Sequence, residues 1–219
     1  MARDKKPCII FIDEVDSLAG ARTDGENEAS RRVKTEFLVQ MQGVGHDDKG
    51  VLVLGATNLP WAIDPAIRRR FEKRVYIPLP DEEARFFMLK HNMKTTPTDV
   101  QDGDFRKYAQ MTDGYSGSDI SILVRDAIYG PVRRLESSKY WRQGVRKDGK
   151  PGWEPAPENM AGQPGVVQKS LMDIKQDELI VPAVSIEDFE GALKKSKPSV
   201  NQAQLGEYEN FTSEFGQEG

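Results

Sequence analysis

Two compact apolar runs, residues 8–12 and 51–56, stand out in the first part of the chain. Short runs rich in Ile, Val and Leu are typical of strands buried on both faces of a sheet. A third short run, at 74–77, precedes Pro78 and predicts another strand. The order strand, helix, strand predicts a parallel α/β sheet. The helix between the first two strands is indicated by apolar residues at helical spacing before a stop at Gly43, namely Val33, Phe37, Leu38, Met41 and Val44.

After the third strand the pattern changes to helical spacing. Asp81 is expected to cap a first helix, and either Ser118 or Asp119 opens a strongly amphipathic second one. Ser185 is expected to cap a third helix, which Pro198 ends, and an amphipathic helix follows it. The apolar stripes of these four helices are Phe86, Phe87 and Leu89; Ile120, Leu123, Val124, Ala127 and Ile128; Ile186, Phe189 and Leu193; and Leu205, Tyr208, Phe211 and Phe215.

Residues 137–169 differ from their surroundings, because they are rich in Gly and Pro and hold several aromatic side chains. Asp148 and Gly149 provide the turn chemistry of a hairpin, so this stretch predicts an inserted β-hairpin module. Its aromatic side chains either meet a partner or form a small core within the module, and we favour a core for at least some of them. The residues concerned are Tyr140, Trp141 and Trp153.

The composition narrows the class of protein. The chain has 31 Lys and Arg against 35 Asp and Glu, and its net charge of −4 argues against a nucleic-acid binder with a basic face. The apolar runs are far too short to span a bilayer. Cys8 is the single cysteine, which excludes an internal disulfide and favours a reducing, cytoplasmic compartment. His46 and His91 have no second ligand at metal-binding spacing, which predicts surface histidines.

Polar residues follow both apolar strands directly. Asp13 and Glu14 come after the first strand, and Thr57 and Asn58 come after the second, so all four are expected at the ligand-binding edge of the sheet. Phosphoryl transfer needs an acidic residue to hold Mg²⁺ and a second group to orient or deprotonate the attacking water. The residues alone leave a plainer interpretation open, namely solvated carboxylates and a turn before Pro60.

A basic segment, Arg68-Arg69-Arg70, follows these strands. It could be a solvated turn or a nucleic-acid patch. In an assembled nucleotidase, guanidinium groups instead reach a neighbour's γ-phosphate, a contribution worth about 10³ to 10⁵ in rate. Because the three motifs occur in this order, they favour nucleotide hydrolysis.

These segments together resemble the motifs of AAA ATPases. Residues 8–14 look like a Walker B strand, residues 57–58 like sensor 1, and residues 67–71 like the arginine-finger segment. Residues 114–120 resemble the small-domain signature of the subgroup that contains microtubule-severing enzymes and the ESCRT-III disassembly ATPases. The resemblance covers essentially the whole chain. Within the subgroup, the β insertion and the terminal helix point to the vacuolar protein sorting type.

The resemblance implies a role for each candidate site residue. Asp13 would act on Mg²⁺, Glu14 would be the catalytic base, and Asn58 would be the sensor at the nucleotide. Arg69 and Arg70 would be fingers donated in trans to the adjacent subunit. The implied cofactors are ATP and Mg²⁺.

The resemblance also implies an α/β fold in which a partial parallel AAA sheet, without its P-loop strand, precedes a small helical lid domain. The expected division is 1–79 for the large domain, 80–197 for the lid with its β insertion at 137–169, and 198–219 for the C-terminal helix. The polar stretch 21–27 lies where the family has its second pore loop, although its composition also suits an ordinary mobile loop.

The family's P-loop should lie upstream of Walker B, and the chain begins too late to contain it. We therefore expect the C-terminal part of a larger enzyme. Residues 144–150 imitate the start of a P-loop, but Pro151 supplies no hydroxyl for Mg²⁺, and no buried strand before or helix after is plausible. We reject this match.

The resemblance implies a homohexamer in the full-length protein that hydrolyses ATP to disassemble ESCRT-III polymers in endosomal sorting. It would be cytoplasmic and peripheral at endosome membranes, with ESCRT-III subunits as partners, an activator protein at the β insertion, and no nucleic acid. Two alternatives stay open. A microtubule-severing relative would carry a basic, substrate-facing insertion, whereas a noncatalytic assembly module follows from the missing P-loop.

Overall fold

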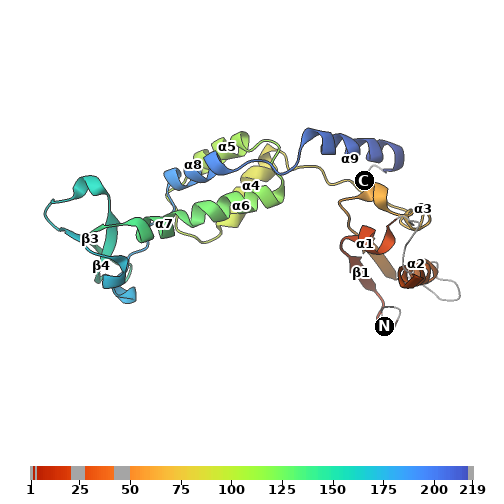
Figure 1. The fold of residues 1–219 in the computed structure, drawn as a ribbon, viewed down its shortest axis with the longest axis horizontal. Coiled ribbons are helices and arrows are strands. Elements are labelled where there is room, and N and C mark those ends of the chain that lie inside the picture. The colour runs from red at the N-terminus through yellow and green to blue at the C-terminus, as the bar shows by residue number, and fades with distance from the viewer. Residues whose placement is uncertain (1, 3, 21–27, 42–49, 217–219) are drawn as a thin grey trace. The chain divides into compact units, whose positions relative to one another are not determined.

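The chain folds into two compact units, each with its own apolar core. The sheet unit comprises Met1–Ile77 and Ala203–Gly219, and the helical unit comprises Pro78–Gln202. No helix that is described is long and apolar enough to cross a membrane. The structure is a computed structural model that describes residues 2, 4–20, 28–41 and 50–216 (Figure 1).

The sheet unit is built on two parallel strands, as the order strand, helix, strand predicts. β1 (Cys8–Ile12) pairs with β2 (Val51–Gly55) along the full length of both strands. Helix α2 (Glu28–Met41) connects them and confirms the predicted helix up to Met41, whereas the expected stop at Gly43 lies outside the described residues. The remaining elements of the unit are α1 (Val15–Ala19), the 3-10 turn η1 (Pro60–Ala62), α3 (Pro65–Arg68) and α9 (Gln202–Phe215).

The two strands are not buried on both faces, which corrects the prediction. One face packs against a core formed by Val15, Ala19, Ile63 and Ile67. On the other, no described residue covers the apolar side chains, because the described sheet has two strands and its core lies on one side. The exposed fractions are 67% for Ile9, 60% for Phe11, 57% for Leu52 and 51% for Leu54.

The strand expected at 74–77 is not formed, and this prediction was wrong. The segment has no regular secondary structure, and Val75 and Ile77 are 62% and 85% exposed. A strand is defined by ladder hydrogen bonds to a neighbour, and the described sheet ends at β2. The segment therefore has the composition of a strand but no strand to pair with among the described residues.

We expect amide hydrogen exchange of the 219-residue chain to be fast at 51–56 and 75–77 and slow at 120–128. β2 has a ladder partner among the described residues on one edge only and 75–77 has none, whereas 120–128 lies in the core of the helical unit. Exchange read by mass spectrometry at peptide resolution tests this. Equally strong protection of all three segments would show that the sheet unit closes in a way that leaves no unpaired edge.

The helical unit contains α4 (Glu82–Met93), α5 (Asp102–Met111), α6 (Gly117–Ile128) and α8 (Ile186–Lys195), which pack side by side (Figure 1). Asp81 and Ser185 cap α4 and α8 with their side chains, as predicted. Phe87 departs from its predicted stripe, because it is 63% exposed. Burial raises the pKa of Tyr108, which stacks on Phe189, to about 12. Outside the β insertion, the largest fully buried side chains of this unit are Tyr108, Phe189, Leu89, Ile120, Leu123, Val124, Val184 and Thr112.

Helix α6 begins at a different cap from the one expected. Ser116, rather than Ser118 or Asp119, is the N-cap, and its hydroxyl accepts a hydrogen bond from the Asp119 amide. The Asp119 carboxylate in turn accepts a hydrogen bond from the Ser116 amide at 2.9 Å, which completes a capping box. It also accepts from the amide and hydroxyl of Ser199, at 3.2 and 3.0 Å. Asp119 thus ties the segment after α8 to the start of α6.

Replacing Asp119 with Ala should lower the free energy of unfolding of the helical unit by about 1–3 kcal/mol, because donors on two segments lose the charged acceptor that they share. Burial alone would raise the pKa of Asp119, but the hydrogen bonds from Ser116 and Ser199 together outweigh it and hold the pKa below its ordinary value. The stabilisation is therefore complete above the unfolded-state pKa of about 3.9 and is lost as pH falls through the lower folded pKa.

Urea unfolding at pH 7 and at low pH measures this difference. The exposed Asp177, which pairs with no described residue, gives the matched control Asp177→Ala. An Asp119→Ala cost that did not shrink toward low pH would contradict the assignment.

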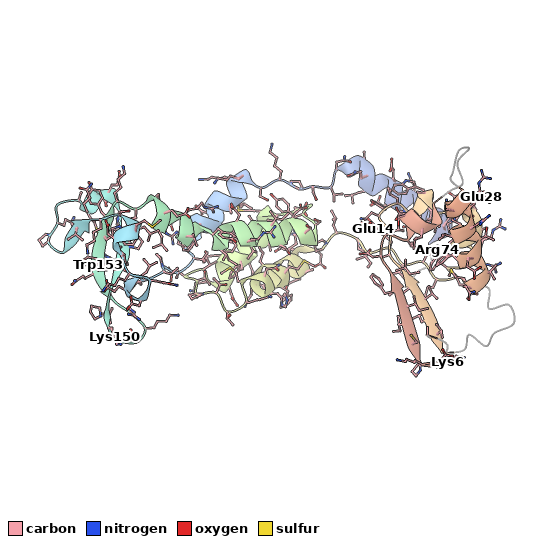
Figure 2. The ribbon with its side chains drawn as sticks, turned by 60° about the horizontal axis from the view of Figure 1, so that its bottom comes forward. Lys6, Glu14, Glu28, Arg74, Lys150 and Trp153 are labelled. Carbon is pink, nitrogen blue, oxygen red and sulfur yellow. The ribbon has the colours of Figure 1, made fainter. Side chains whose placement is uncertain are left out.

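The predicted insertion is a three-stranded antiparallel sheet that follows α7 (Gly130–Ser137). β3 (Tyr140–Val145) lies between β4 (Pro151–Ala156) and β5 (Val166–Gln168). Gly149, with φ of +79°, makes the expected turn, and Figure 2 labels Lys150 beside it. Residues 144–150 belong to this hairpin, which confirms that they are not a P-loop. Short 3-10 turns complete the module: η2 (Glu158–Met160), η3 (Leu171–Asp173) and η4 (Gln176–Glu178).

The module has its own core, centred on the fully buried Trp141. The Trp141 indole donates a hydrogen bond to the Lys169 carbonyl at 3.1 Å, and the Lys169 ammonium lies 3.7 Å from the centre of the Trp153 ring. Leu135 and Ile174 complete the buried cluster. The core interpretation is therefore confirmed for Trp141.

Candidate active site

The segments that carry the predicted acidic and sensor residues lie side by side at the carboxyl edge of the two strands. Beyond the ladder, the Ala56 amide donates to the Ile12 carbonyl and the Val15 amide donates to the Ala56 carbonyl, both at 2.9 Å. These bonds hold the segment at Asp13 beside the segment at Thr57. Parallel strands end at the same edge, so two short sequence motifs become one polar surface.

Glu14 occupies an uncommon backbone conformation. Its φ and ψ of 48° and 47° lie in the left-handed region, which costs a non-glycine residue about 1–3 kcal/mol. The Asp13 carboxylate accepts a hydrogen bond from the Glu14 amide at 2.9 Å and supports this turn into α1. Figure 2 shows Glu14 at the end of the strand pair opposite Lys6. Both carboxylates are exposed.

Sequence reasoning missed one residue that shapes this edge. The Thr57 hydroxyl donates to the Asp16 carboxylate at 2.5 Å and accepts from the Leu59 amide at 2.9 Å. Asp16 therefore pins the start of the Thr57–Asn58 turn against α1. Nothing local in the sequence distinguishes Asp16 from a solvated helix residue, since its partner lies 41 residues further along the chain, after β2. The Asn58 side chain is exposed and bonds to no described residue.

The basic segment begins at Arg68, the last residue of α3, and this helix is firmly anchored. Asp64 caps the helix by accepting from the Ala66 amide at 2.7 Å, and Ile67 is fully buried in the core of the sheet unit. Arg69 and Arg70 are exposed, and their guanidinium groups form no hydrogen bond or ion pair with a described residue. Arg68 differs from them, because it is held against α9. The anchor thus leaves two guanidinium groups available to another molecule.

The residues at the edge fit Mg·ATP in part. The second carboxylate oxygen of Asp13 has no partner among the described residues, which suits an acid that holds Mg²⁺ through water. The described residues contain no cluster of three His, Cys, Asp or Glu side chains that could hold a metal by itself. The phosphate-cradling P-loop is not found in the 219 residues. The predicted pore loop at 21–27 and His46 lie outside the described residues.

Known families match most of the chain. Residues 1–79 match the ATPase family associated with various cellular activities (AAA). Residues 102–143 match the AAA+ lid domain, and residues 159–216 match the Vps4 C terminal oligomerisation domain. The last match spans the β insertion's end, α8 and α9.

Individual proteins agree with this assignment. Vacuolar protein sorting-associated protein 4B of Pongo abelii is 49% identical over 224 residues, which are 100% of this chain and 50% of the relative. A katanin p60 ATPase-containing relative of Danio rerio is 43% identical, with 99% of this chain and 40% of the relative covered. The crystal structure of the FIGL-1 AAA domain in complex with ADP is 35% identical at a TM-score of 0.72, covering 98% of this chain and 60% of that one.

The chain spans about half the length of the vacuolar protein sorting relatives that it matches. The matches to the AAA family, to the lid domain and to the C-terminal domain follow one another along the chain. The chain belongs to the AAA ATPases, in their vacuolar protein sorting branch.

Proposed function

We propose that the protein containing this chain is an ATP-hydrolysing homohexamer that disassembles ESCRT-III polymers in endosomal sorting. The observation that carries the proposal is the carboxylate pair Asp13–Glu14 beside Asn58 at one sheet edge. The match of residues 159–216 to the Vps4 C terminal oligomerisation domain supports the choice of branch.

In this proposal each residue has one task. The Glu14 carboxylate accepts the proton of the attacking water, and the Asn58 amide orients that water. Asp13 holds Mg²⁺, and a bound Mg·ATP supplies the phosphoanhydride bond that is cleaved. Arg69 and Arg70 stabilise the charge that develops at the nucleotide of the adjacent subunit, which agrees with guanidinium groups that lack a partner in their own subunit.

The proposed partners follow from the same branch. ESCRT-III subunits are the substrates, and the protein acts in the cytoplasm, peripherally at endosome membranes. The β insertion is the proposed site for an activator protein, because the module folds around its own core and still leaves Val145 and Met172 76% and 91% exposed. The net charge of −4 argues against a nucleic-acid partner.

Microtubule severing is the second candidate, because the katanin relative is 43% identical. The match at residues 159–216 and the 49% identity to a vacuolar protein sorting relative favour the first. A noncatalytic assembly module is the third candidate, since the chain itself carries no P-loop.

A polypeptide in which a P-loop segment precedes this chain should hydrolyse ATP and release subunits from ESCRT-III polymers, measured by sedimentation. It should leave stabilised microtubules intact. The 219-residue chain by itself is the control and should bind no Mg·ATP in calorimetry, because it lacks the backbone nest and lysine that cradle phosphates. Severing of microtubules would select the second candidate. Assembly without ATP hydrolysis would select the third.

A further inference from the structure

Helix α9 meets the sheet unit at the sensor turn through a directed contact. The Tyr208 hydroxyl donates a hydrogen bond to the Asn58 carbonyl at 2.6 Å. The ring of Tyr208 also lies beside two aromatic side chains, with ring centres 5.1 Å from Trp61 and 6.0 Å from Tyr76. These ring contacts restrain the side chain that carries the hydroxyl. The backbone of Asn58 is therefore restrained from outside its own loop, while its side chain stays free.

The other end of α9 meets the finger segment. The Arg68 guanidinium lies 4.0 Å from the centre of the Phe215 ring. Arg74 donates to the Phe215 carbonyl at 2.7 Å and to the Arg68 carbonyl at 3.3 Å, so one guanidinium joins the last turns of α3 and α9. Carbonyls at helix ends lack partners within the helix, and a cation there is favourable. The residue directly before Arg69 is thus held by both its side chain and its backbone.

The two contacts lie on one face of α9. Tyr208 and Phe215 are about two helical turns apart, so a single rigid element reaches both motifs. We propose that α9 sets the geometry of two different active sites: Tyr208 is a positioning residue for Asn58, and Phe215 is a positioning residue for Arg69 and Arg70. In this proposal both residues act through their neighbours and not by contact with the nucleotide. The inference rests on the proposed function, because it takes Asn58 as sensor and the arginines as fingers.

This proposal differs from a purely structural role for α9 in one measurable way. Asn58 serves the nucleotide of its own subunit, whereas the fingers serve the nucleotide of the neighbour. Loss of the Tyr208 contact should therefore act in cis, and loss of the Phe215 contact should act in trans. A general loss of stability would affect both sites alike.

The test uses the assembled protein in which a P-loop segment precedes this chain. In homogeneous assemblies, Tyr208→Phe and Phe215→Leu should each lower kcat about tenfold and leave the nucleotide KM unchanged, because displacement of a positioned group costs rate rather than binding. Tyr76→Phe is the matched control for the hydroxyl, since the Tyr76 hydroxyl bonds to no described residue. Phe215→Tyr keeps the ring and should retain activity.

Mixed assemblies separate cis from trans. Subunits that carry Glu14→Gln cannot hydrolyse their own nucleotide, but they still present fingers to wild-type neighbours. Adding Phe215→Leu to these subunits should lower the turnover of a one-to-one mixture with wild type, whereas adding Tyr208→Phe should leave it unchanged. Thermal unfolding of each variant checks that it is folded.

The results distinguish the inference from the proposed function. If the wild-type assembly hydrolyses no ATP, the proposed function fails. If wild type is active but both variants keep full kcat, or if both lower the mixed turnover equally, the positioning roles are wrong. If Phe215→Leu fails to fold, Tyr208→Phe and its control Tyr76→Phe still test the positioning of Asn58. Arg68→Met, which removes the contact with Phe215, then replaces Phe215→Leu in the test of the fingers.

Discussion

Glu14→Gln should abolish most ATP turnover in the assembled protein while leaving nucleotide binding intact. Loss of a positioned general base costs typically about 10²–10⁴ in rate. The amide has nearly the shape of the carboxylate, so the left-handed turn at Glu14 and its hydrogen bond to Asp13 are expected to persist. The variant should therefore collect in an ATP-bound assembly, which steady-state hydrolysis and retention of labelled ATP measure together.

The exposed carboxylate of Glu207 on α9 provides a control, because it pairs with no described residue. Glu207→Gln changes the same functional group and should keep wild-type turnover. If Glu14→Gln hydrolysed ATP within a few fold of wild type, another group would have to be the base. If it failed to bind ATP, the role of Glu14 would be structural.

Arg69→Ala or Arg70→Ala should lower turnover by about 10³–10⁵, the typical contribution of an arginine finger. Each variant should still bind nucleotide in its own subunit, since the guanidinium groups are exposed and contact no described residue there. The fold should be little changed for the same reason. Turnover, nucleotide affinity and the unfolding midpoint of each variant test the three statements.

The trans assignment has its own measurement. When Arg69→Ala or Arg70→Ala subunits are mixed with Glu14→Gln subunits, sites that hydrolyse should arise only where an intact Glu14 faces intact fingers of a neighbour. Activity should therefore reappear in the mixture, although each variant is inactive alone. A mixture as inactive as its components would show that the arginines act within their own subunit or only support the fold.

Much of the fold follows from local patterns in the sequence. The strands at 8–12 and 51–55 and the helices capped by Asp81 and Ser185 lie where apolar spacing and cap chemistry predict them. The candidate site was also visible as motifs, because Asp13 and Glu14 follow one strand and Asn58 follows the next. Each of these signals is carried by contiguous residues, whose intrinsic preferences act before any distant contact forms.

Other features were decided by tertiary structure alone. The segment at 74–77 has strand composition but no ladder, since pairing depends on a neighbour and not on the segment itself. The start of α6 at Ser116 was misplaced by two or three residues, because several polar residues could cap it and the packing of Asp119 against Ser199 selects one.

Which of the arginines is held in place and which are exposed also depends on contacts with residues far along the chain. Arg68, Arg69 and Arg70 form one basic run, from which only the family resemblance singles out Arg69 and Arg70. The fold places Arg68 against Phe215 and brings Tyr208 to Asn58. Residues so far apart in the chain carry no local signal of their pairing. The sequence thus determined which groups are chemically able to act. Packing decided which of them are held in place and which stay free, because that depends on side chains that only the folded chain brings together.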